Sequence, residues 1–359
     1  MQQNDLWDNP IGTDGFEFVE FTAAEPSTLA RLFESLGFTA TAKHRSKEVV
    51  LYRQGDVNFI LNAEPRSQAA HFGSAHGPGA NAMALRVKDA GAAMRQLIER
   101  GAEFVASGAG PMELQIPAIR GIGGALVYLV DRYGDQTIYD VDFYPIDGAP
   151  ANPRGVGLAC IDHLTHNVET GHMQRWAEFY SHYFNFREIR HFDIEGKLTG
   201  LRSKAMTSPC GKIRIPINES DGEQGQIQEF LEQYRGEGIQ HIALATADIH
   251  ATVESLRGKG IEFMHTPDSY YERIDVRVPE HDQDLVRLRH NRILIDGAPA
   301  AGDGLLLQIF TSPVIGPIFF EIIQRIGNEG FGEGNFQALF ESIEEDQIRR
   351  GVLEEGAAA

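Results

Sequence analysis

Residues 81–104 read NAMALRVKDAGAAMRQLIERGAEF, and residues 240–263 read QHIALATADIHATVESLRGKGIEF. The two stretches align without a gap at a constant offset of 159 residues, so that Asp89 matches Asp248 and Gly101 matches Gly260. Each begins with a strand pattern and continues into an amphipathic helical pattern. An internal match at a fixed offset indicates a duplicated architecture.

Two further pairs of segments repeat in the same order. FEFVEFTAAEPSTLARLFESLGF, residues 16–38, is similar to IDHLTHNVETGHMQRWAEFYSHYFNF, residues 161–186, and each reads as a strand, a polar turn and a helix. A weaker pair sets GALVYLV before TIYDVDF against GLLLQIF before IFFEIIQ. One such match could be coincidence, but three in the same order indicate a tandem duplication.

The repeat predicts the fold class and the domains. We expect an α+β protein in which each half pairs two βαβββ modules, and in which the two halves form open barrel-like domains. Pro and Gly interrupt the periodicity in YPIDGAPANPRGVG, residues 144–157. We therefore predict an N-terminal repeat domain without metal over residues 1–152 and a C-terminal catalytic domain over residues 153–359.

A last element lies outside the repeat. After the loop GNEGFGEG, Asn335 is a suitable helix N-cap, and Gly351 ends the apolar pattern. The apolar residues between them follow helical spacing and are Phe336, Leu339, Phe340 and Ile343. This pattern predicts a C-terminal helix docked by one face, and the glycines of GFGEGNF favour a hinged lid.

The overall charge restricts the classes of partner. The chain has 32 Lys and Arg residues against 51 Asp and Glu residues, a formal net charge of −19. Phosphate backbones and anionic membrane surfaces would be repelled on average, so we expect no nucleic-acid or membrane partner. The N-terminus lacks a secretory signal pattern, and the only cysteines, Cys160 and Cys210, form no disulfide framework. We expect a cytoplasmic protein that binds a small molecule.

Polar residues found in only one half of a duplication are informative, because both halves must keep the same packing positions. The strand FEFV aligns with IDHL, which sets Phe18 opposite His163. In the gapless pair, Ala82 stands opposite His241. The C-terminal half therefore carries two histidines at positions where the N-terminal half has apolar residues.

A glutamate completes a candidate metal site. Glu321 lies in the apolar stretch PIFFEIIQ, and Asp140 falls near it in the weakest repeat pair. An unpaired carboxylate is costly to bury in such a strand, and a cation is the simplest remedy. Two imidazoles and one carboxylate form the facial triad of non-haem iron(II) enzymes. His166 is three residues from His163, faces the other way on a strand and is interpreted as structural.

These residues lie in a pattern that resembles the 4-hydroxyphenylpyruvate dioxygenase family of the vicinal oxygen chelate superfamily, over essentially the full length. The matching motifs are IDHLTHNV around His163, IPINE around Asn218, GQIQEFL around Gln226, GIQHIAL around His241, LLLQIFT around Gln308, FFEIIQR around Glu321, and GFGEGNF. The His and Glu motifs suit several members of the superfamily. The GFGEGNF ending makes the match specific, since extradiol ring-cleaving relatives lack it.

The resemblance implies the cofactor, the substrate and the reaction. It implies one Fe(II) per chain on His163, His241 and Glu321. It also implies a substrate pocket lined by Ser203, Asn218, Gln226, Gln240, Gln308, Phe310, Phe331 and Phe336. Among these, the amides of Gln226 and Gln240 are expected to take part in catalysis by orienting the substrate, and Asn335 is expected to help seat the C-terminal helix. The implied reaction converts 4-hydroxyphenylpyruvate and O2 to homogentisate and CO2, in tyrosine and phenylalanine catabolism.

Two other functions remain open at this point. A 4-hydroxymandelate synthase would use the same fold and substrate and hydroxylate the benzylic carbon, although Asn218 and Phe310 favour the homogentisate-forming enzyme. A metal-free small-molecule binding protein would have the fold without needing two histidines and a buried glutamate in one half only. The resemblance also implies a homo-oligomer, either a dimer or a tetramer.

Overall fold

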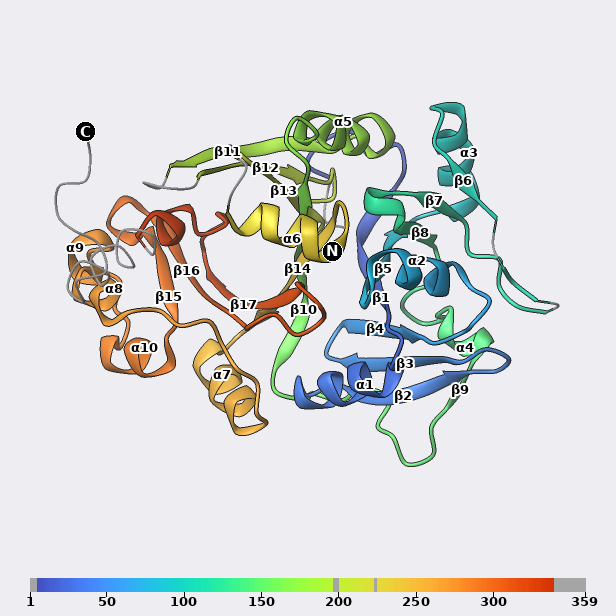
Figure 1. Cartoon of the computed structure of the whole chain (residues 1–359), viewed down its shortest axis with the longest axis horizontal. Helices are drawn as coiled ribbons and strands as arrows, with labels where there is room; N and C mark the ends of the chain where they lie inside the picture. The colour runs from blue at the N-terminus through green and yellow to red at the C-terminus, as the bar shows by residue number, and fades with distance from the viewer. Residues whose placement is uncertain (1–4, 107, 111, 196–199, 223–224, 339–359) are drawn as a thin grey trace.

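The computed structural model describes residues 5–106, 108–110, 112–195, 200–222 and 225–338. The N-terminal half and the C-terminal half each form a curled β-sheet with helices outside it, and the two halves lie side by side (Figure 1). No helix in the described part of the chain has the length and apolar character that crossing a bilayer requires.

The N-terminal half contains two βαβββ modules. The first is β1 (Thr13–Thr22), α1 (Pro26–Ser35), β2 (Thr39–His44), β3 (Val49–Gln54) and β4 (Val57–Asn62). The second is β5 (Gly79–Val87), α3 (Ala90–Glu99), β6 (Phe104–Val105), β7 (Ala118–Arg120) and β8 (Leu126–Val130). Between and after them lie α2 (Gln68–His76), η1 (Ile122–Gly124), α4 (Tyr139–Asp142) and β9 (Phe143–Pro145).

The C-terminal half repeats this order with one insertion. Its first module is β10 (Leu158–Val168), α5 (Met173–Phe184), β11 (Arg187–Glu195), β12 (Gly200–Thr207) and β13 (Arg214–Ser220), and α6 (Gln226–Tyr234) follows. Its second module is β14 (Gly238–Thr246), α7 (Ile249–Gly258), β15 (Leu294–Ala298), β16 (Asp303–Phe310) and β17 (Phe319–Ile326). The elements α8 (Asp268–Glu272), α9 (Ile274–Arg277) and α10 (Leu285–Asn291) are inserted before β15, and η2 (Pro299–Ala301) follows it.

The strand order confirms the duplication. The first sheet runs β6-β7-β8-β5-β1-β4-β3-β2-β9, and the second, read from its other end, runs β15-β16-β17-β14-β10-β13-β12-β11. Apart from β9, the two orders are the same strand for strand. Asp89 and Asp248, matched in the sequence, occupy the same structural position, since their side chains cap α3 and α7 by accepting from Ala92 N and Ala251 N. The predicted α+β fold of paired βαβββ modules is therefore confirmed.

The strand register tests the matched residues. Phe18 pairs with Ala84 in the first sheet, and His163 pairs with Ala243 in the second, so the match of Phe18 with His163 is confirmed. Glu20 pairs with Ala82 just as Thr165 pairs with His241, which confirms the second match.

The weakest repeat pair was wrong. GALVYLV contains β8, which pairs in parallel with β5 in the first sheet. In the second sheet, β17 pairs in parallel with β14 in the same way. The structural counterpart of GALVYLV is therefore the FFEIIQ strand and not GLLLQIF. In the first sheet Tyr128 pairs with Ala84, and in the second sheet Glu321 pairs with Ala243, the residue that matches Ala84. The N-terminal residue at the position of the glutamate is therefore Tyr128 and not Asp140. Asp140 lies on the short helix α4, whereas Glu321 lies on a strand.

The two halves share one hydrophobic core. A continuous cluster of buried side chains includes residues from both sheets, and the rings of Phe59 on β4 and Phe320 on β17 lie 5.8 Å apart across the junction. The connecting segment is fixed by Gln54, whose amide donates to Leu36 O and accepts from Val156 N and Leu158 N. The two halves are thus joined both by a shared core and by hydrogen bonds to the connecting segment.

The final helix begins earlier than predicted. Residues 333–338 are helical, so Asn335 is the third residue of the helix and is not its N-cap. Its side chain is buried, and its Oδ1 accepts from the Tyr270 hydroxyl at 2.6 Å. Asn335 therefore joins the helix start to the α8 insertion. The predicted continuation through Leu339, Phe340, Ile343 and Gly351 lies outside the described residues.

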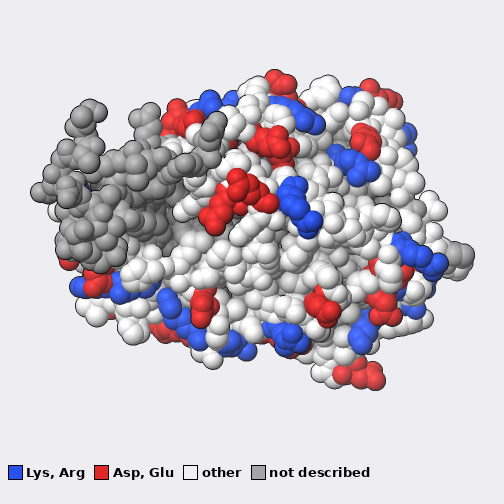
Figure 2. Space-filling view, in the orientation of Figure 1, with Lys and Arg blue, Asp and Glu red and all other residues white. Residues whose placement is uncertain are grey.

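The surface charges are mixed on the face shown in Figure 2. Acidic and basic side chains lie close to one another over this face, and no dense basic patch forms on it. Like the net charge of −19, this distribution offers no basic surface of the kind that binds nucleic acid on the face shown.

Candidate metal centre

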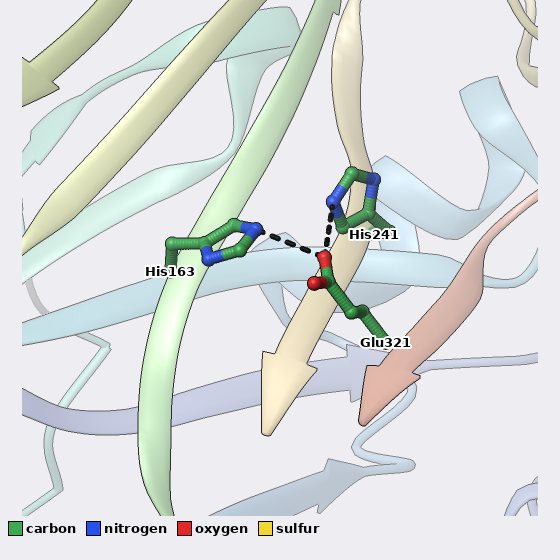
Figure 3. Close-up of side chains that lie close together, drawn as sticks. All are labelled: His163, His241 and Glu321. Atoms are coloured by element: carbon green, nitrogen blue, oxygen red, sulfur yellow. Dashed lines mark ion pairs between the residues drawn. The ribbon is translucent and has the colours of Figure 1, made fainter. Parts of the chain in front are cut away.

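Three neighbouring strands bring His163, His241 and Glu321 together. His163 lies on β10, His241 on β14 and Glu321 on β17, and their side chains point toward one another inside the curled sheet (Figure 3). The three are 2%, 6% and 2% exposed, respectively. Side chains alternate between the faces of a strand, and the register aligns these three on the same inner face. Their ligand atoms all lie within 4.8 Å of one another.

The local geometry leaves one nitrogen of each imidazole directed at the centre. His163 Nδ1 is hydrogen-bonded to Asp162 Oδ1, and His241 Nδ1 to Gln240 Oε1, both at 2.8 Å. Each Nδ1 must therefore carry the proton, because both partners accept, and each Nε2 is left with a lone pair. The Nε2 atoms lie 3.2 and 3.4 Å from Glu321 Oε2. Lone pairs facing one another at these distances call for a shared cation or proton.

The electrostatics of the three groups are coupled. Burial alone would lower the pKa of His163, but the facing Glu321 and Asp162 carboxylates outweigh it and raise this pKa. Burial lowers the pKa of His241, and the neighbouring His163 acts in the same direction. For Glu321, burial opposes ionisation, yet the two imidazoles hold its pKa below the ordinary value. The group thus favours an ionised Glu321 and a neutral His241, both of which a metal site requires, while a metal ion would have to displace any proton held by His163.

The donor set fits a divalent metal of the iron type. Two imidazole nitrogens and one carboxylate on one side of a site, with the other side free, are the ligands of non-haem iron(II) proteins. Glu321 Oε1 is buried and has no hydrogen-bond partner in the described part of the chain. A second free carboxylate oxygen beside two directed nitrogens supports metal binding over a purely structural ion pair.

A second layer of polar groups holds the histidine ligands. Asp162 is buried, and besides His163 it contacts Arg325, whose Nε and Nη2 donate to its two oxygens at 2.7 and 2.8 Å. These charges outweigh the effect of burial and hold the pKa of Asp162 well below its usual range. Asp162 is therefore a permanent anion behind His163, and such partners orient a ligand and raise its basicity.

Most of the polar residues expected in the substrate pocket lie on this inner face. Ser203 on β12 and Asn218 on β13 are direct cross-strand partners, and Gln308 on β16 pairs with Ile323, two residues from Glu321. Ser203 and Gln308 are completely buried, yet Ser203 Oγ and both amide atoms of Gln308 lack partners among the described residues. Buried polar atoms are normally satisfied, so these unpaired ones indicate a ligand.

The two amides that were predicted to take part in catalysis lie in different surroundings. Gln240 uses its Oε1 to hold His241 and retains only its Nε2 for a further contact. Gln226 is exposed at the first position of α6. The structure thus places Gln240 behind a ligand and Gln226 at a helix start beyond the strands.

Aromatic rings form a chain from the histidines to the final helix. The ring of Phe331 lies 5.5 Å from that of His163, and the ring of Phe310 lies 6.2 Å from that of His241. Phe336 on the final helix lies 6.1 Å from Phe310. The three predicted phenylalanines therefore line one side of the centre.

Sequence reasoning missed Asn167. Its pairing with Asn218 places it on the inner face, four residues after His163, and it is completely buried with both amide atoms unpaired among the described residues. The alternation of IDHLTHNV could have revealed it, since His163, Thr165 and Asn167 share one face of the strand. His166 faces outward to the Tyr180 hydroxyl, as predicted for a structural residue.

Comparison with known proteins identifies the relatives of this architecture. A family model described as "Hydroxyphenylpyruvate dioxygenase, HPPD, N-terminal" matches residues 7–144. The model of the "Glyoxalase/Bleomycin resistance protein/Dioxygenase superfamily" matches residues 160–274. The first model thus covers most of the N-terminal half, and the second covers the first part of the C-terminal half.

Full-length relatives agree with these models. The chain is 64% identical to a protein named Hemolysin VllY from Vibrio vulnificus, over 96% of this chain and 98% of that protein. It is 63% identical to a 4-hydroxyphenylpyruvate dioxygenase from Pseudomonas aeruginosa, over 96% of this chain and 97% of that enzyme.

A solved structure extends the comparison to the fold. A mutant of 4-hydroxymandelate synthase from Streptomyces coelicolor superposes with a TM-score of 0.80 at 26% identity, covering 94% of this chain and 99% of that one. Identity of this extent to a full-length enzyme, together with the matched N-terminal model, shows that the chain belongs to the 4-hydroxyphenylpyruvate dioxygenase family.

Proposed function

We propose that this chain is an Fe(II)-dependent dioxygenase that converts 4-hydroxyphenylpyruvate and O2 to homogentisate and CO2, with one iron per chain. The observation that carries the proposal is the inward-facing group of His163, His241 and Glu321 in a chain of this family. In the described structure Glu321 Oε1 has no hydrogen-bond partner, and the two Nε2 atoms face only Glu321 Oε2.

The three ligands would leave one side of the metal open to substrate. Fe(II) held there would supply a template for the 2-keto acid and the electron-transfer chemistry that dioxygen requires. Asp162 and Gln240 fix the two imidazoles with Nε2 inward, so the ligands are arranged before the metal binds. This arrangement limits the reorganisation that metal binding would require.

The polar residues on the inner face would orient the organic substrate. Ser203, Asn218 and Gln308 offer hydroxyl and amide groups that hydrogen-bond a phenol or a keto acid without adding net charge to the site. Asn167 lies beside Asn218 and adds a further unpaired amide to this set. Because buried unpaired groups are costly, a substrate that pairs them is favoured over one that does not.

The aromatic side chains would exclude water from the reacting atoms. Phe310 and Phe331 contact the two histidine rings, and Phe336 extends this wall onto the final helix. An apolar wall beside a few convergent polar groups is the usual composition of a small-molecule site. Asn335, held by Tyr270, would keep the start of that helix over the site.

The proposal is tested by product analysis. The purified chain is loaded anaerobically with Fe(II), mixed with 4-hydroxyphenylpyruvate and exposed to O2, and the product is identified by chromatography and mass spectrometry. Homogentisate, with one CO2 released per O2 consumed, is the expected result. The Glu321→Ala variant should bind less iron and form no product.

The other outcomes separate the remaining functions. 4-Hydroxymandelate as the product would keep the ligands and the substrate and assign the chain to the sister reaction, which the structural similarity to that synthase makes a meaningful comparison. If the wild-type chain neither retains iron nor consumes O2, the proposal is wrong, and a metal-free binding protein becomes the better account.

A further inference from the structure

The N-terminal sheet has the same inner face as the metal centre but different residues on it. The three positions that correspond to His163, His241 and Glu321 are occupied by Phe18, Ala82 and Tyr128. The rings of Phe18 and Tyr128 lie 5.7 Å apart. These side chains cannot reproduce the ligand set of the C-terminal half, so any ligand of this half must be bound in another way.

These residues do not fill the interior of the N-terminal sheet. A cavity of about 300 Å³ remains, which is at the lower end of the range for small-molecule sites. Protein interiors are close-packed, and voids larger than a water molecule are few. Its apolar walls come from both modules and include Phe18, Val49, Ile60, Ile116, Leu126 and Ile138. A cavity of this size and composition can hold a molecule with one ring.

A buried carboxyl group forms the polar end of the cavity. Glu20 lies two residues after Phe18 on β1, lines the cavity and is 7% exposed. Its Oε1 accepts from Asn62 Nδ2 at 3.0 Å and from Asn81 Nδ2 at 2.6 Å. Both of these hydrogen bonds fall on Oε1, and Oε2 takes part in neither. Oε2 is therefore the Glu20 oxygen that a ligand at this end of the cavity could use.

The charge state of this end favours an uncharged ligand. Burial raises the pKa of Glu20 despite its amide partners. Tyr128 also lines the cavity, and burial raises the pKa of its hydroxyl above its ordinary value. At the mouth, Lys47 is already paired with Glu113 at 2.7 Å and does not select an anion. The acidic residues Glu20, Glu64, Glu113 and Asp142 line the cavity against the basic Lys47 and Arg66, so an anionic ligand is disfavoured on balance.

We propose that the N-terminal half contains a second, metal-independent binding site for a small uncharged phenol. The phenol hydroxyl would bond to Glu20, and the ring would lie against Phe18, Ile60 and Leu126. The inference is independent of the reaction at the iron centre. It rests on the cavity in the half that has no ligand set and on the Glu20 carboxyl group, which lines that cavity and uses only Oε1 for its two amide hydrogen bonds.

The test is crystallographic, because a phenol could also enter the C-terminal site. Crystals of the full chain are soaked with 4-bromophenol, and the bromine is located by its anomalous signal. We expect a bromine peak between Phe18, Ile60 and Leu126, separate from any peak near His163. Absence of a peak from the N-terminal cavity would overturn the proposal.

Calorimetry with related probes tests the hydroxyl contact. Bromobenzene should bind about tenfold more weakly than 4-bromophenol, because it cannot pair the Glu20 carboxyl. The anion 4-bromobenzoate should not bind in this cavity. Equal binding of bromobenzene and 4-bromophenol would show that the hydroxyl contact contributes nothing and would contradict the proposal. A bromine peak in crystals with no measurable binding in solution would show binding at crystal concentration only and would also contradict it.

Variants assign the binding to this cavity. Ala118 lines it and is 2% exposed, so Ala118→Phe should fill the space and abolish the N-terminal peak while leaving iron binding unchanged. Glu20→Gln keeps both a donor and an acceptor and should retain binding within about threefold, whereas Glu20→Leu should lose about tenfold or more. Equal binding by the Gln and Leu variants would exclude the assigned role of Glu20. If a variant does not fold, the comparison of 4-bromophenol, bromobenzene and 4-bromobenzoate on the wild-type chain still tests whether the site exists.

Discussion

Arg325 and Asp162 form a bidentate ion pair directly behind the metal centre, although 163 positions separate them in the sequence. Asp162 precedes the ligand His163, and Arg325 lies four residues after the ligand Glu321 on β17. Arg325 Nη1 also donates to the carbonyl oxygens of Asn328 and Gly330, at 3.1 and 2.6 Å. The pair therefore joins two ligand strands and the loop that leads to the final helix.

The first prediction concerns the charge of Asp162. In Asp162→Asn, the side chain can still accept from His163 Nδ1 but no longer makes that imidazole more basic. We expect the affinity for Fe(II) to fall by about 10- to 100-fold, as for other residues behind metal ligands. Anaerobic competition with a chelator measures this change.

A matched aspartate provides the control. Asp56 also pairs with an arginine through both oxygens, each at 2.9 Å from Arg86, but it is exposed and belongs to the other half. Asp56→Asn should leave the iron affinity unchanged. An equal loss in both variants would show that Asp162 acts only through general stability.

The second prediction concerns the cost of removing the bidentate partner of Asp162. Arg325→Met leaves this buried carboxylate with the His163 hydrogen bond and with Arg214, whose Nη1 lies 3.7 Å from Oδ2. Breaking a buried pair typically costs about 3–5 kcal/mol of unfolding free energy, and the remaining Arg214 should keep the loss toward the lower end of this range. The double variant Asp162→Asn/Arg325→Met removes the charge as well and should recover most of the loss. Urea unfolding of the iron-free chain measures all three variants. If the two single effects simply add, the ion pair is not the source of the loss.

The architecture could be read from the sequence because duplication preserves what packing requires. Asp89 and Asp248 are both N-caps, and the residues around them keep one offset through a strand and a helix. The two histidines could be found because Phe18 and Ala82 mark their positions in the other half. Glu321 was found for a different reason, since a glutamate within an apolar strand is unusual by itself.

The rest could not be predicted, for physical reasons. The strand containing Tyr128 is a short apolar segment with no distinctive residue to align. The α8–α10 insertion also changes the spacing between strands in the second half. The third pair of repeat segments was therefore matched wrongly. The ion pair of Asp162 with Arg325 has no local pattern because it depends on tertiary contact. Asn335 fits the composition of an N-cap but is used instead to bind Tyr270.

The third prediction is a pH dependence of stability caused by His166. This residue is completely buried beside the Tyr180 hydroxyl, and burial lowers its pKa to about 3. An unfolded histidine titrates near about 6.5, so between these values the unfolded chain binds a proton that the folded chain excludes. The contribution of His166 is therefore fully present above pH 6.5 and is lost as the pH falls toward 3.

Glutamine at this position should remove that dependence. The wild-type chain should lose up to about 1.4 kcal/mol per pH unit through His166 in this window, and His166→Gln should show a correspondingly smaller slope. Urea unfolding at several pH values between 7 and about 5 measures the difference. The exposed His71 is the control, and His71→Gln should keep the wild-type slope. Identical slopes for all three proteins would contradict the assignment.

The fourth prediction compares two glutamines that are equally buried and differently satisfied. Gln308 and Gln54 are both 0% exposed. Gln54 makes three hydrogen bonds to backbone groups, two of them to the segment between the halves. Neither amide atom of Gln308 has a partner within the described ranges. A buried polar group without partners reduces stability, whereas a satisfied one supports it.

Leucine at the two positions should therefore act in opposite directions. Gln308→Leu should stabilise the substrate-free chain by about 1 kcal/mol or more, because an unpaired amide is removed, and should weaken anaerobic binding of 4-hydroxyphenylpyruvate by about tenfold. Gln54→Leu should destabilise the chain by about 2 kcal/mol or more, because Val156 N and Leu158 N lose their acceptor. Urea unfolding and anaerobic substrate titration measure the two effects. Destabilisation by Gln308→Leu with unchanged substrate affinity would show that Gln308 serves the fold, since a residue kept for its ligand should raise stability when it is lost.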